Sequence, residues 1–396
     1  MSDYKRIGDY IEKVDKRNKS EVVKDLKGIN IEKYFMPSVA NVVGTDLSRY
    51  KIVKPGEFAC NRMHVGRDYK LPVAFSEYEE DIIVSPAYDV FRITNQNALL
   101  PEYLMMWFSR DEFDRNAWFY TDTDVRGKLG WEDFCNMKLP VPPLAKQQKI
   151  VQEYQRINKR IQLNEKLIQK LEETAQELFN SCFNQQETNG EFKRLGDLIE
   201  IRGGFSYNSK DLSRGNSYLL GMGCISFSSR FLEDGMRLYS DEYPEKYQVK
   251  PKDIVIATRQ QSENMPILGY PAMIPPDLEE KKLVVASNLY RVLNKSDWSN
   301  EVLYQLLRSP DYLEHIRLNT KGTTVGMITK DAIEDYYFNL PKSKFIAKLN
   351  IDLQTIVNLI FTKRKEIKHL IMMNGVILSK LTNLITIENE YMAENE

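Results

Sequence analysis

Residues 139–185 read LPVPPLAKQQKIVQEYQRINKRIQLNEKLIQKLEETAQELFNSCFNQ, and this stretch decides the architecture of the chain. The prolines at its beginning stiffen the chain and favour the start of a helix directly after them. Neither proline nor glycine interrupts residues 144–185, and apolar residues recur there at alternating spacings of four and three. This pattern predicts a long helix with a coiled-coil seam. The predicted seam positions are Ile150, Tyr154, Ile157, Ile161, Asn164, Ile168 and Leu171.

A second seam with the same spacing lies 199 residues further along the chain. Its positions match those of the first seam one by one: Leu349, Leu353, Ile356, Ile360, Lys363, Ile367 and Leu370. One polar residue interrupts each seam, Asn164 and Lys363, and such a position commonly sets the register of paired helices. We predict that the two helices pair antiparallel. Parallel pairing, and packing of each helix on its own domain, are the alternatives.

The segments that precede the two helices also repeat. Residues 4–11 (YKRIGDYI) recur at an offset of 188 as residues 192–199 (FKRLGDLI), and the offset reaches 201 where Leu139 matches Leu340. The second copy is therefore a lengthened version of the first. Short runs of β-branched residues between Gly- or Pro-containing turns predict strands, and apolar residues at three-to-four spacing predict helices. The strands are expected at 81–84, 254–256 and 283–285, and the helices at 101–116 and 301–316.

These repeats predict an α+β protein in which two duplicated mixed α/β domains are separated by two long helices that form an antiparallel coiled coil. The expected boundaries are 1–143 for the first domain, 144–185 for the first helix, 186–343 for the second domain and 344–390 for the second helix.

The composition narrows the class of protein. With 396 residues and 42% apolar content, the chain can form two domains with cores of their own. Its 55 basic and 56 acidic residues nearly cancel, so any basic surface must be local. Four cysteines without a CxxC pair, and only three histidines, predict free thiols in a reducing compartment and no metal site. The apolar patches, such as residues 103–108, look too short to span a bilayer, which predicts a soluble cytoplasmic protein with no membrane partner.

Several motifs resemble those of the specificity subunits of type I restriction–modification systems. They are LPVPPL at 139–144, QQKIV at 147–151, LNEKLI at 163–168, NRM at 61–63, VSPAY at 84–88 and KRLGD at 193–197. The resemblance covers essentially the whole chain. The second junction, LPKSK at 340–344, departs from the pattern because it lacks the later prolines and the Gln-Gln pair. The two junctions are therefore not expected to dock partners in the same way.

This resemblance implies that each globular copy is a target recognition domain that reads one half of a bipartite, asymmetric site on double-stranded DNA. The helices would set the distance between the half-sites and would bind two methyltransferase (modification) subunits. Two motor–nuclease (restriction) subunits would join this complex. The chain itself would be non-catalytic and hold no cofactor, because S-adenosylmethionine, ATP and Mg²⁺ would belong to the partners. The residues agree, since the sequence lacks the Asn-Pro-Pro-Tyr, GxGxxG, P-loop, GxSxG and HExxH motifs.

Candidate DNA-reading residues lie in polar segments at matched positions of the two copies. Arg and Lys suit guanine, and Asn and Gln suit adenine, and such groups are usually carried on loops. The segments are 61–70 and 121–128 in the first copy, and 259–264 and 319–324 in the second. They differ in sequence, as two different half-sites require, although a solvated loop is the competing interpretation for any single residue. The candidates are Asn61, Arg62, His64, Arg67, Lys70, Arg126, Lys128, Arg259, Gln260, Gln261, Asn264, Lys321, Thr323 and Thr324.

Two other functions share this architecture. A coiled-coil adaptor would bind proteins and have no DNA-reading role, and the absence of salt-dependent duplex binding by the assembled complex would identify it. A recognition subunit of a related restriction system, with a fused methyltransferase–nuclease partner, would be identified by the subunit that co-purifies. The basic residues Lys363, Arg364, Lys365 and Lys368 either face phosphates or a partner, or form a solvated helix face.

Overall fold

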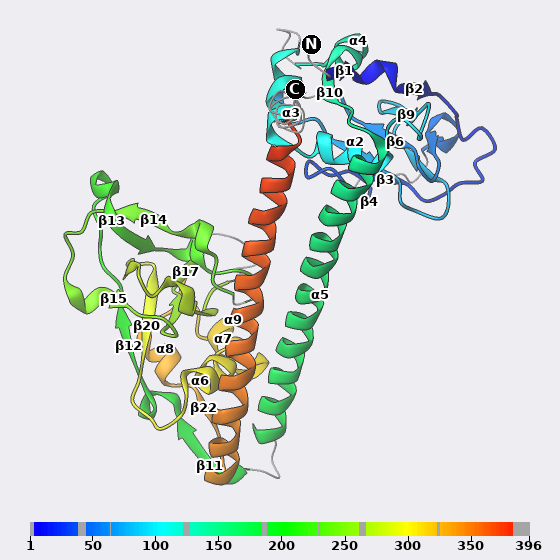
Figure 1. Cartoon of the computed structure of the whole chain (residues 1–396). Helices are drawn as coiled ribbons and strands as arrows, with labels where there is room; N and C mark the ends of the chain where they lie inside the picture. Colours follow the sequence, from blue (N-terminus) through cyan, green and yellow to red (C-terminus); the bar gives the residue numbers. More distant parts are fainter. Residues whose placement is uncertain are drawn as a thin grey trace. The chain divides into compact units, whose positions relative to one another are not determined.

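The computed structural model describes residues 4–38, 45–63, 65–121, 127–183, 188–228, 230–260, 267–322 and 325–382. The chain divides into two compact units. The first unit contains Met1–Ile161 and His369–Glu396, and the second contains Gln162–Lys368. The two long helices are α5 (Leu144–Phe183) and α9 (Ser343–Lys380), and they are drawn in green and orange-red in Figure 1. Each unit therefore holds one globular domain together with part of each long helix.

The first globular domain combines short strands with short helices. Its strands are β1 (Tyr4–Arg6), β2 (Ile11–Val14), β3 (Lys27–Ile29), β4 (Phe35–Pro37), β5 (Lys51–Val53), β6 (Phe58–Cys60), β7 (Val73–Phe75), β8 (Ile82–Val84), β9 (Asp89–Ile93) and β10 (Lys138–Pro140). Its helices are α1 (Val65–Asp68), α2 (Pro101–Phe108), α3 (Asp111–Phe119) and α4 (Trp131–Asn136). The main sheet is antiparallel with the order β2-β9-β6-β7, and the pairs β3-β4, β5-β8 and β1-β10 accompany it.

The second globular domain repeats this plan with additions. Its strands are β11 (Thr188–Arg194), β12 (Ile199–Gly203), β13 (Leu212–Leu220), β14 (Arg237–Tyr239), β15 (Gln248–Val249), β16 (Ile254–Ala257), β17 (Arg259–Gln260), β18 (Pro271–Met273), β19 (Lys282–Val285), β20 (Leu289–Asn294), β21 (Gly326–Met327) and β22 (Tyr337–Pro341). Its helices are α6 (Asn300–Leu306), α7 (Pro310–Leu318) and α8 (Lys330–Glu334). The sheet order β12-β20-β16-β18 matches that of the main sheet in the first domain. A further sheet has the order β14-β13-β19-β15, in which β13 and β14 extend the pair β15-β19. Strands β8, β16 and β19 confirm the three predicted strands.

The duplication extends to individual turns. Gly56 and Lys252 occupy matched positions at an offset of 196 and both have positive φ, +82° and +66°. In each turn the next carboxylate accepts a hydrogen bond from a backbone N–H 2.9 Å away: Glu57 from Lys54, and Asp253 from Lys250. Positive φ is unfavourable for a residue such as lysine. Its retention in the second copy shows that the turn itself is part of the repeated scaffold.

Each of the two predicted short helices is in fact a pair of helices, so the expectation of one helix over 101–116 and one over 301–316 was wrong. In the first domain the chain is extended at Arg110 (φ −85°, ψ 140°), between α2 and α3. In the second domain Ser309 caps α7 by accepting from the Tyr312 N–H, and Pro310 follows at the first helical position. Proline cannot continue a helix that precedes it. The apolar spacing runs through both breaks, which is why periodicity alone did not reveal them.

The long helices run antiparallel to each other within each unit. In the first unit, the beginning of α5 packs with the end of α9, because Val151 and Leu381 share one core and the Asn374 side chain donates to Asn158 Oδ1 at 2.6 Å. In the second unit, the end of α5 packs with the beginning of α9, since Phe179 and Leu353 share the other core. The predicted pairing is therefore found in both units.

The predicted seam positions are all buried or half-buried. In α5, Asn164 and Ile168 are buried, and Ile150, Tyr154, Ile157, Ile161 and Leu171 are half-buried. In α9, Leu349, Leu353 and Ile360 are buried, and Ile356, Lys363, Ile367 and Leu370 are half-buried. Burial of one stripe along each helix is what a four-three spacing produces.

The basic cluster on α9 mainly forms ion pairs inside the second unit. Arg364 pairs with Glu172 of α5 at 2.7 Å, and Lys363 pairs with Glu366 one turn further along α9 at 2.8 Å. Lys368 pairs with Glu233 and with Asp277, the latter at 2.7 Å. Arg364 and Lys368 thus connect α9 with α5 and with the second globular domain. The expectation of a phosphate-binding or simply solvated face does not describe these two residues.

Helix α9 contains an 18-residue stretch with a mean hydropathy of 1.2 and few charges, so by length and composition it could cross a membrane. This finding corrects the expectation that every apolar stretch is too short. Packing accounts for part of this composition, because Ile346, Leu349, Leu353 and Val357 lie in the core of the second unit, and 28% of the stretch is buried. None of Cys60, Cys135, Cys182 and Cys224 forms a disulfide, and burial raises the pKa of Cys60 to about 12 and that of Cys224 to about 11. No group of three metal-ligating side chains occurs among the described residues.

Candidate nucleic-acid interface

The two polar segments predicted to read DNA come together in the first globular domain. We call residues 61–63, 65–70 and 127–129 the first loop pair. The Leu129 N–H donates to the Arg62 carbonyl at 3.0 Å, and the Gly66 N–H donates to the Gly127 carbonyl at 2.8 Å. A Cβ atom on Gly66 would lie 2.5 Å from the Cα of Gly127. Only glycine therefore allows the two backbones to approach this closely.

The corresponding segments of the second domain also come together. We call residues 258–260 and 321–328 the second loop pair, of which 323 and 324 lie outside the described residues. Strand β17 pairs with β21, so that Arg259 lies opposite Met327. Lys321 and Met327 exchange both backbone hydrogen bonds, at 2.9 and 2.8 Å. Two candidates from separate segments, Arg259 and Lys321, thus lie on either side of one residue.

Both loop pairs are anchored in the same way. The Ile328 N–H donates to the Thr258 carbonyl at 3.1 Å, which repeats the bond between Leu129 and Arg62. The carbonyls of Leu129 and Ile328 then each accept a hydrogen bond from a side chain. In the first domain the donor is the Arg62 guanidinium, and in the second it is the Tyr290 hydroxyl at 3.2 Å. The scaffold is common to both domains, and the side chains that complete it differ.

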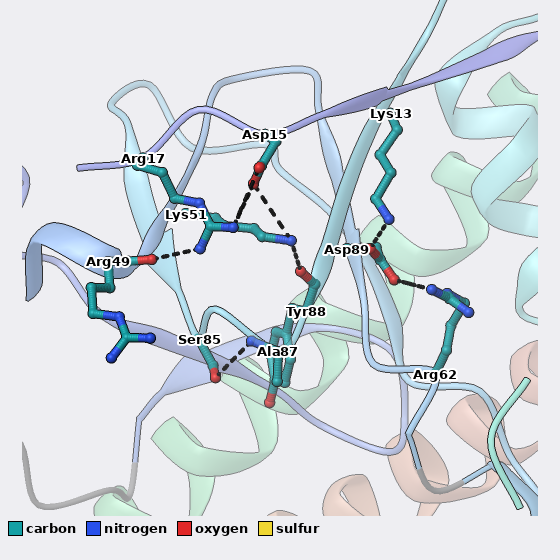
Figure 2. Close-up of polar contacts among 10 residues, drawn as sticks. All are labelled: Lys13, Asp15, Arg17, Arg49, Lys51, Arg62, Ser85, Ala87, Tyr88 and Asp89. Carbon is teal, nitrogen blue, oxygen red and sulfur yellow. Dashed lines mark hydrogen bonds and ion pairs between the residues drawn. The ribbon is translucent and has the colours of Figure 1, made fainter. Parts of the chain in front are cut away.

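Arg62 belongs to a buried ion-pair network, shown in Figure 2. Its Nε lies 2.8 Å from Asp89 Oδ2, and Lys13 Nζ reaches Asp89 Oδ1 from the other side at 2.5 Å. Burial alone would raise the pKa of Asp89, but the hydrogen bond from Lys13 and the charge of Arg62 outweigh it, so the pKa is lowered. Arg62 is only 7% exposed, so we do not include it among the residues that we propose to contact bases.

The turn before β9 is held by a second set of polar contacts in Figure 2. Lys51 is buried, and its Nζ donates to the Tyr88 carbonyl at 2.7 Å and lies 3.7 Å from Asp15. The motifs at 61–63 and 84–88 therefore contain or adjoin residues that hold the first loop pair and the turn before β9 in place.

Most of the other described candidates lie on the surface of the two loop pairs. Lys128, Arg259 and Lys321 are exposed. Arg67 is exposed and pairs with the neighbouring Asp68 at 2.7 Å, and Lys70 pairs with Glu32 at 2.8 Å. These five cations can be reached from the surface. To bind DNA, however, Arg67 and Lys70 would each have to give up the ion pair with a carboxylate.

Two amide candidates serve their own loops. The Asn61 side chain accepts from the Met63 N–H at 3.1 Å, and the Gln260 side chain accepts from the Ile267 N–H at 2.7 Å. Each of these hydrogen bonds uses the side-chain carbonyl oxygen and does not involve the side-chain NH₂ group. The remaining candidates lie outside the described residues: His64, Arg126, Gln261, Asn264, Thr323 and Thr324.

Exposed apolar side chains beside the loop pairs were missed by the sequence analysis. Phe119, at the end of α3, is 76% exposed, and its counterpart Leu318, at the end of α7, is 68% exposed. Tyr69 is also exposed and lies against Trp118, with ring centroids 5.4 Å apart. The sequence feature that could have revealed them is the run Trp118-Phe119-Tyr120, because its aromatic residues lie at the end of a polar helix.

Comparison with known proteins identifies the class that this arrangement defines. The type I restriction modification DNA specificity domain matches residues 73–173 and 187–370, which together make up well over half of the chain. The chain belongs to this family and is a specificity subunit of a type I restriction–modification system. No curated protein sequence matches the chain.

Three solved structures match the chain over nearly its whole length. The S subunit of a type I restriction–modification system from M. genitalium superimposes with a TM-score of 0.59 at 11% identity, covering 96% of this chain and 95% of that one. Two further structures match at 18% identity. One was solved in work on complex assembly and conformational transition of the type I R-M system (TM-score 0.47, 96% and 97% covered). The other is the HsdS subunit from Thermoanaerobacter tengcongensis (TM-score 0.37, 96% of both chains).

Proposed function

We propose that the two recognition domains read the two halves of a bipartite, asymmetric DNA site, and that the long helices set the distance between them. One observation carries this proposal: the loop pairs share one backbone anchor but present different exposed side chains. The subunit acts in the cytoplasm and catalyses no reaction itself. The chemistry that uses S-adenosylmethionine, ATP and Mg²⁺ is carried out by two methyltransferase subunits and two motor–nuclease subunits.

Within this proposal, the first half-site contacts Arg67, Lys70 and Lys128, and the second contacts Arg259 and Lys321. An exposed guanidinium or ammonium can reach base edges in the major groove or phosphates beside it. The six candidates outside the described residues, and the amide groups of Asn61 and Gln260, are proposed as further contacts. Phe119 and Leu318 lie beside the loop pairs, where apolar side chains can pack against bases.

Replacing Arg259 and Lys321 by alanine is expected to affect only the second half-site. A bidentate arginine contact contributes about 1–3 kcal/mol of base discrimination, and loss of a phosphate contact lowers the salt dependence of binding by about one counterion. Methylome sequencing of cells that carry the Arg259→Ala, Lys321→Ala double variant should therefore show relaxed recognition in one half-site. Lys128→Ala serves as the control and should affect the other half-site. Equal loss in both half-sites would contradict the assignment.

The complex as a whole can be tested on DNA. Footprinting with the methyltransferase-bound subunit should show two protected patches about one helical turn apart. Binding should weaken steeply as salt is raised, because phosphate contacts release counterions. One continuous patch, or binding that ignores salt, would contradict the proposal and favour a protein adaptor.

We further propose that an apolar groove in the first unit docks a methyltransferase subunit. The groove has a volume of about 750 Å³ and lies between the beginning of α5 and the end of α9, where Ile157, Met372, Met373 and Val376 line it. Met372, Met373 and Val376 are each at least half exposed. An exposed apolar stripe of this kind is typical of a protein–protein interface. The flexible thioether side chains of methionine adapt well to a partner surface.

Replacing Met372 and Val376 by glutamate is expected to weaken methyltransferase binding at least tenfold, since it places two carboxylates in the apolar surface that the partner would cover. The affinity can be measured by calorimetry with the purified methyltransferase subunit. The matched positions on α5 are Glu173 and Glu177, 199 residues earlier, and both are exposed. Their exchange for glutamine is the control and should leave the affinity unchanged. Unchanged binding by the glutamate variant would rule this groove out.

A further inference from the structure

A second cavity in the first unit, of about 520 Å³, lies between the first recognition domain and α5. Its walls come from the β3–β4 hairpin, the segment after β7, helix α2 and the beginning of α5. In Figure 1 the labels of β3, β4 and α2 lie close to the upper end of α5. The lining is acidic and aromatic. It contains Glu32, Glu77 and Glu102 together with Tyr34, Phe75 and Tyr78. We call this the acidic cavity.

The acidic cavity carries negative charge that its own residues do not neutralise. Its one lining lysine, Lys33, is committed, because its Nζ lies 2.8 Å from Asp114 and its side chain is only 6% exposed. Glu32 pairs with Lys70. In the part of the chain that the structure describes, Glu77 and Glu102 have no ion pair. Both carboxylates can therefore accept a cation from outside the chain.

The position in the second unit that corresponds to the acidic cavity encloses almost no open volume. Four lining residues of the acidic cavity, Met105, Met106, Ser109 and Asn158, match the lining residues Tyr304, Gln305, Arg308 and Val357 there, each at an offset of 199. The volume at this second place is only about 20 Å³. Phe231 and Phe361 line it, together with the ion pair between Arg364 and Glu172. The open, acidic form is thus a property of the first unit, and the second unit has two arginines in its place.

Building on the proposed function, we infer that the acidic cavity binds a lysine or arginine side chain from one of the two methyltransferase subunits. Glu77 and Glu102 would accept the cationic group. The ring of Tyr34, which is 53% exposed, would pack against its alkyl stem and charge. The Tyr78 ring already has Lys27 Nζ at 5.4 Å from its centroid. DNA is excluded as the occupant because its phosphates carry the same sign of charge. The end of this chain is excluded for the same reason, because residues 381–396 contain glutamates and neither lysine nor arginine.

This inference makes the two methyltransferase sites chemically different. The subunit at the first unit forms a charge-dependent contact, and the identical subunit at the second unit meets a closed, arginine-containing surface. Screening by salt weakens contacts between partly exposed charges. One of the two association steps should therefore be more sensitive to salt than the other.

The test uses the full-length subunit and its methyltransferase partner. Native mass spectrometry and sedimentation would compare the wild type with a Glu77→Lys, Glu102→Lys variant. The wild type should bind two methyltransferase subunits, and the variant should bind one at the same concentration, with at least a tenfold weaker second step. A Glu79→Lys, Glu80→Lys variant is the matched control, because these exposed residues follow Glu77 closely but do not line the cavity. It should bind two subunits with unchanged affinity.

The possible outcomes separate this inference from the proposed function. If the wild type binds no methyltransferase, the proposed function itself is wrong and the inference fails with it. If the charge-reversed variant binds two subunits as tightly as the wild type, only the inference is overturned. A salt titration of the wild type tests the same point without any substitution. Two association steps with equal salt dependence would overturn the inference even if the variant failed to fold.

Discussion

Replacing Asp89 by alanine is expected to destabilise the first recognition domain by about 3–5 kcal/mol, the usual cost of removing one partner from a buried ion pair. Arg62 is 7% exposed and would remain buried without its carboxylate. Its guanidinium also donates to the Leu129 carbonyl, so the first loop pair should loosen as the domain loses stability. Lys13 would be little affected, because its side chain is 41% exposed.

Urea unfolding followed by tryptophan fluorescence can measure this loss. Trp107, Trp118 and Trp131 lie in the first domain and only Trp298 in the second, so the signal reports mainly on the affected domain. An Arg62→Met, Asp89→Leu double variant is the control, since removing both charges should restore much of the stability. A loss below about 1 kcal/mol for Asp89→Ala, in the range of an exposed ion pair, would contradict the structural role of this pair.

The same pair makes acid stability depend on Asp89. The folded-state pKa of this carboxyl lies below its ordinary value of 3.8. A carboxyl with a lowered pKa stabilises the folded state above its unfolded pKa and loses this contribution as the pH falls through the folded value. The difference in stability between the wild type and Asp89→Ala should therefore be full near neutral pH and shrink below about pH 4.

Inserting four residues into each long helix is expected to widen the gap between the two half-sites. Four residues add about 6 Å and rotate the helix by about 40° beyond a full turn, so the seams remain approximately aligned. The added length corresponds to roughly two base pairs at about 3.4 Å each. The insertions belong after Ile161 in α5 and after Lys368 in α9, where the two compact units meet in sequence. Both helices must be lengthened, because α5 and α9 contact each other antiparallel in each unit.

Methylome sequencing of cells that carry the lengthened subunit provides the measurement. We expect the methylated sites to keep both half-site sequences and to differ only in the gap. Insertion into α5 alone is the control, and it should impair methylation because it shifts one seam against the other. An unchanged gap in the doubly lengthened subunit would refute the proposal that the helices set the spacing.

The sequence predicted the repeated scaffold well because its signals are local and periodic. The four-three spacing from Ile150 to Leu171 identified the buried stripe of α5, and the constant offset of 199 identified the same stripe in α9. The helix breaks at Arg110 and Ser309 were not predicted, because apolar periodicity continues across a helix end whenever both helices face one core. The hydropathy of α9 was underestimated for a related reason: its apolar residues are spread along the helix and do not form a single uninterrupted run.

The candidate site was predicted as a set of segments, and only the tertiary structure decided which residues within them remain at the surface. By itself, the sequence determined the duplication, the paired helices and the two pairs of polar segments. Burial and pairing depend on residues far apart in the chain, such as Asp89 for Arg62 and Glu32 for Lys70, and no local pattern encodes them. The same holds for the acidic cavity, which forms where a hairpin, a short helix and α5 meet, and which the second copy fills with Phe231 and Phe361.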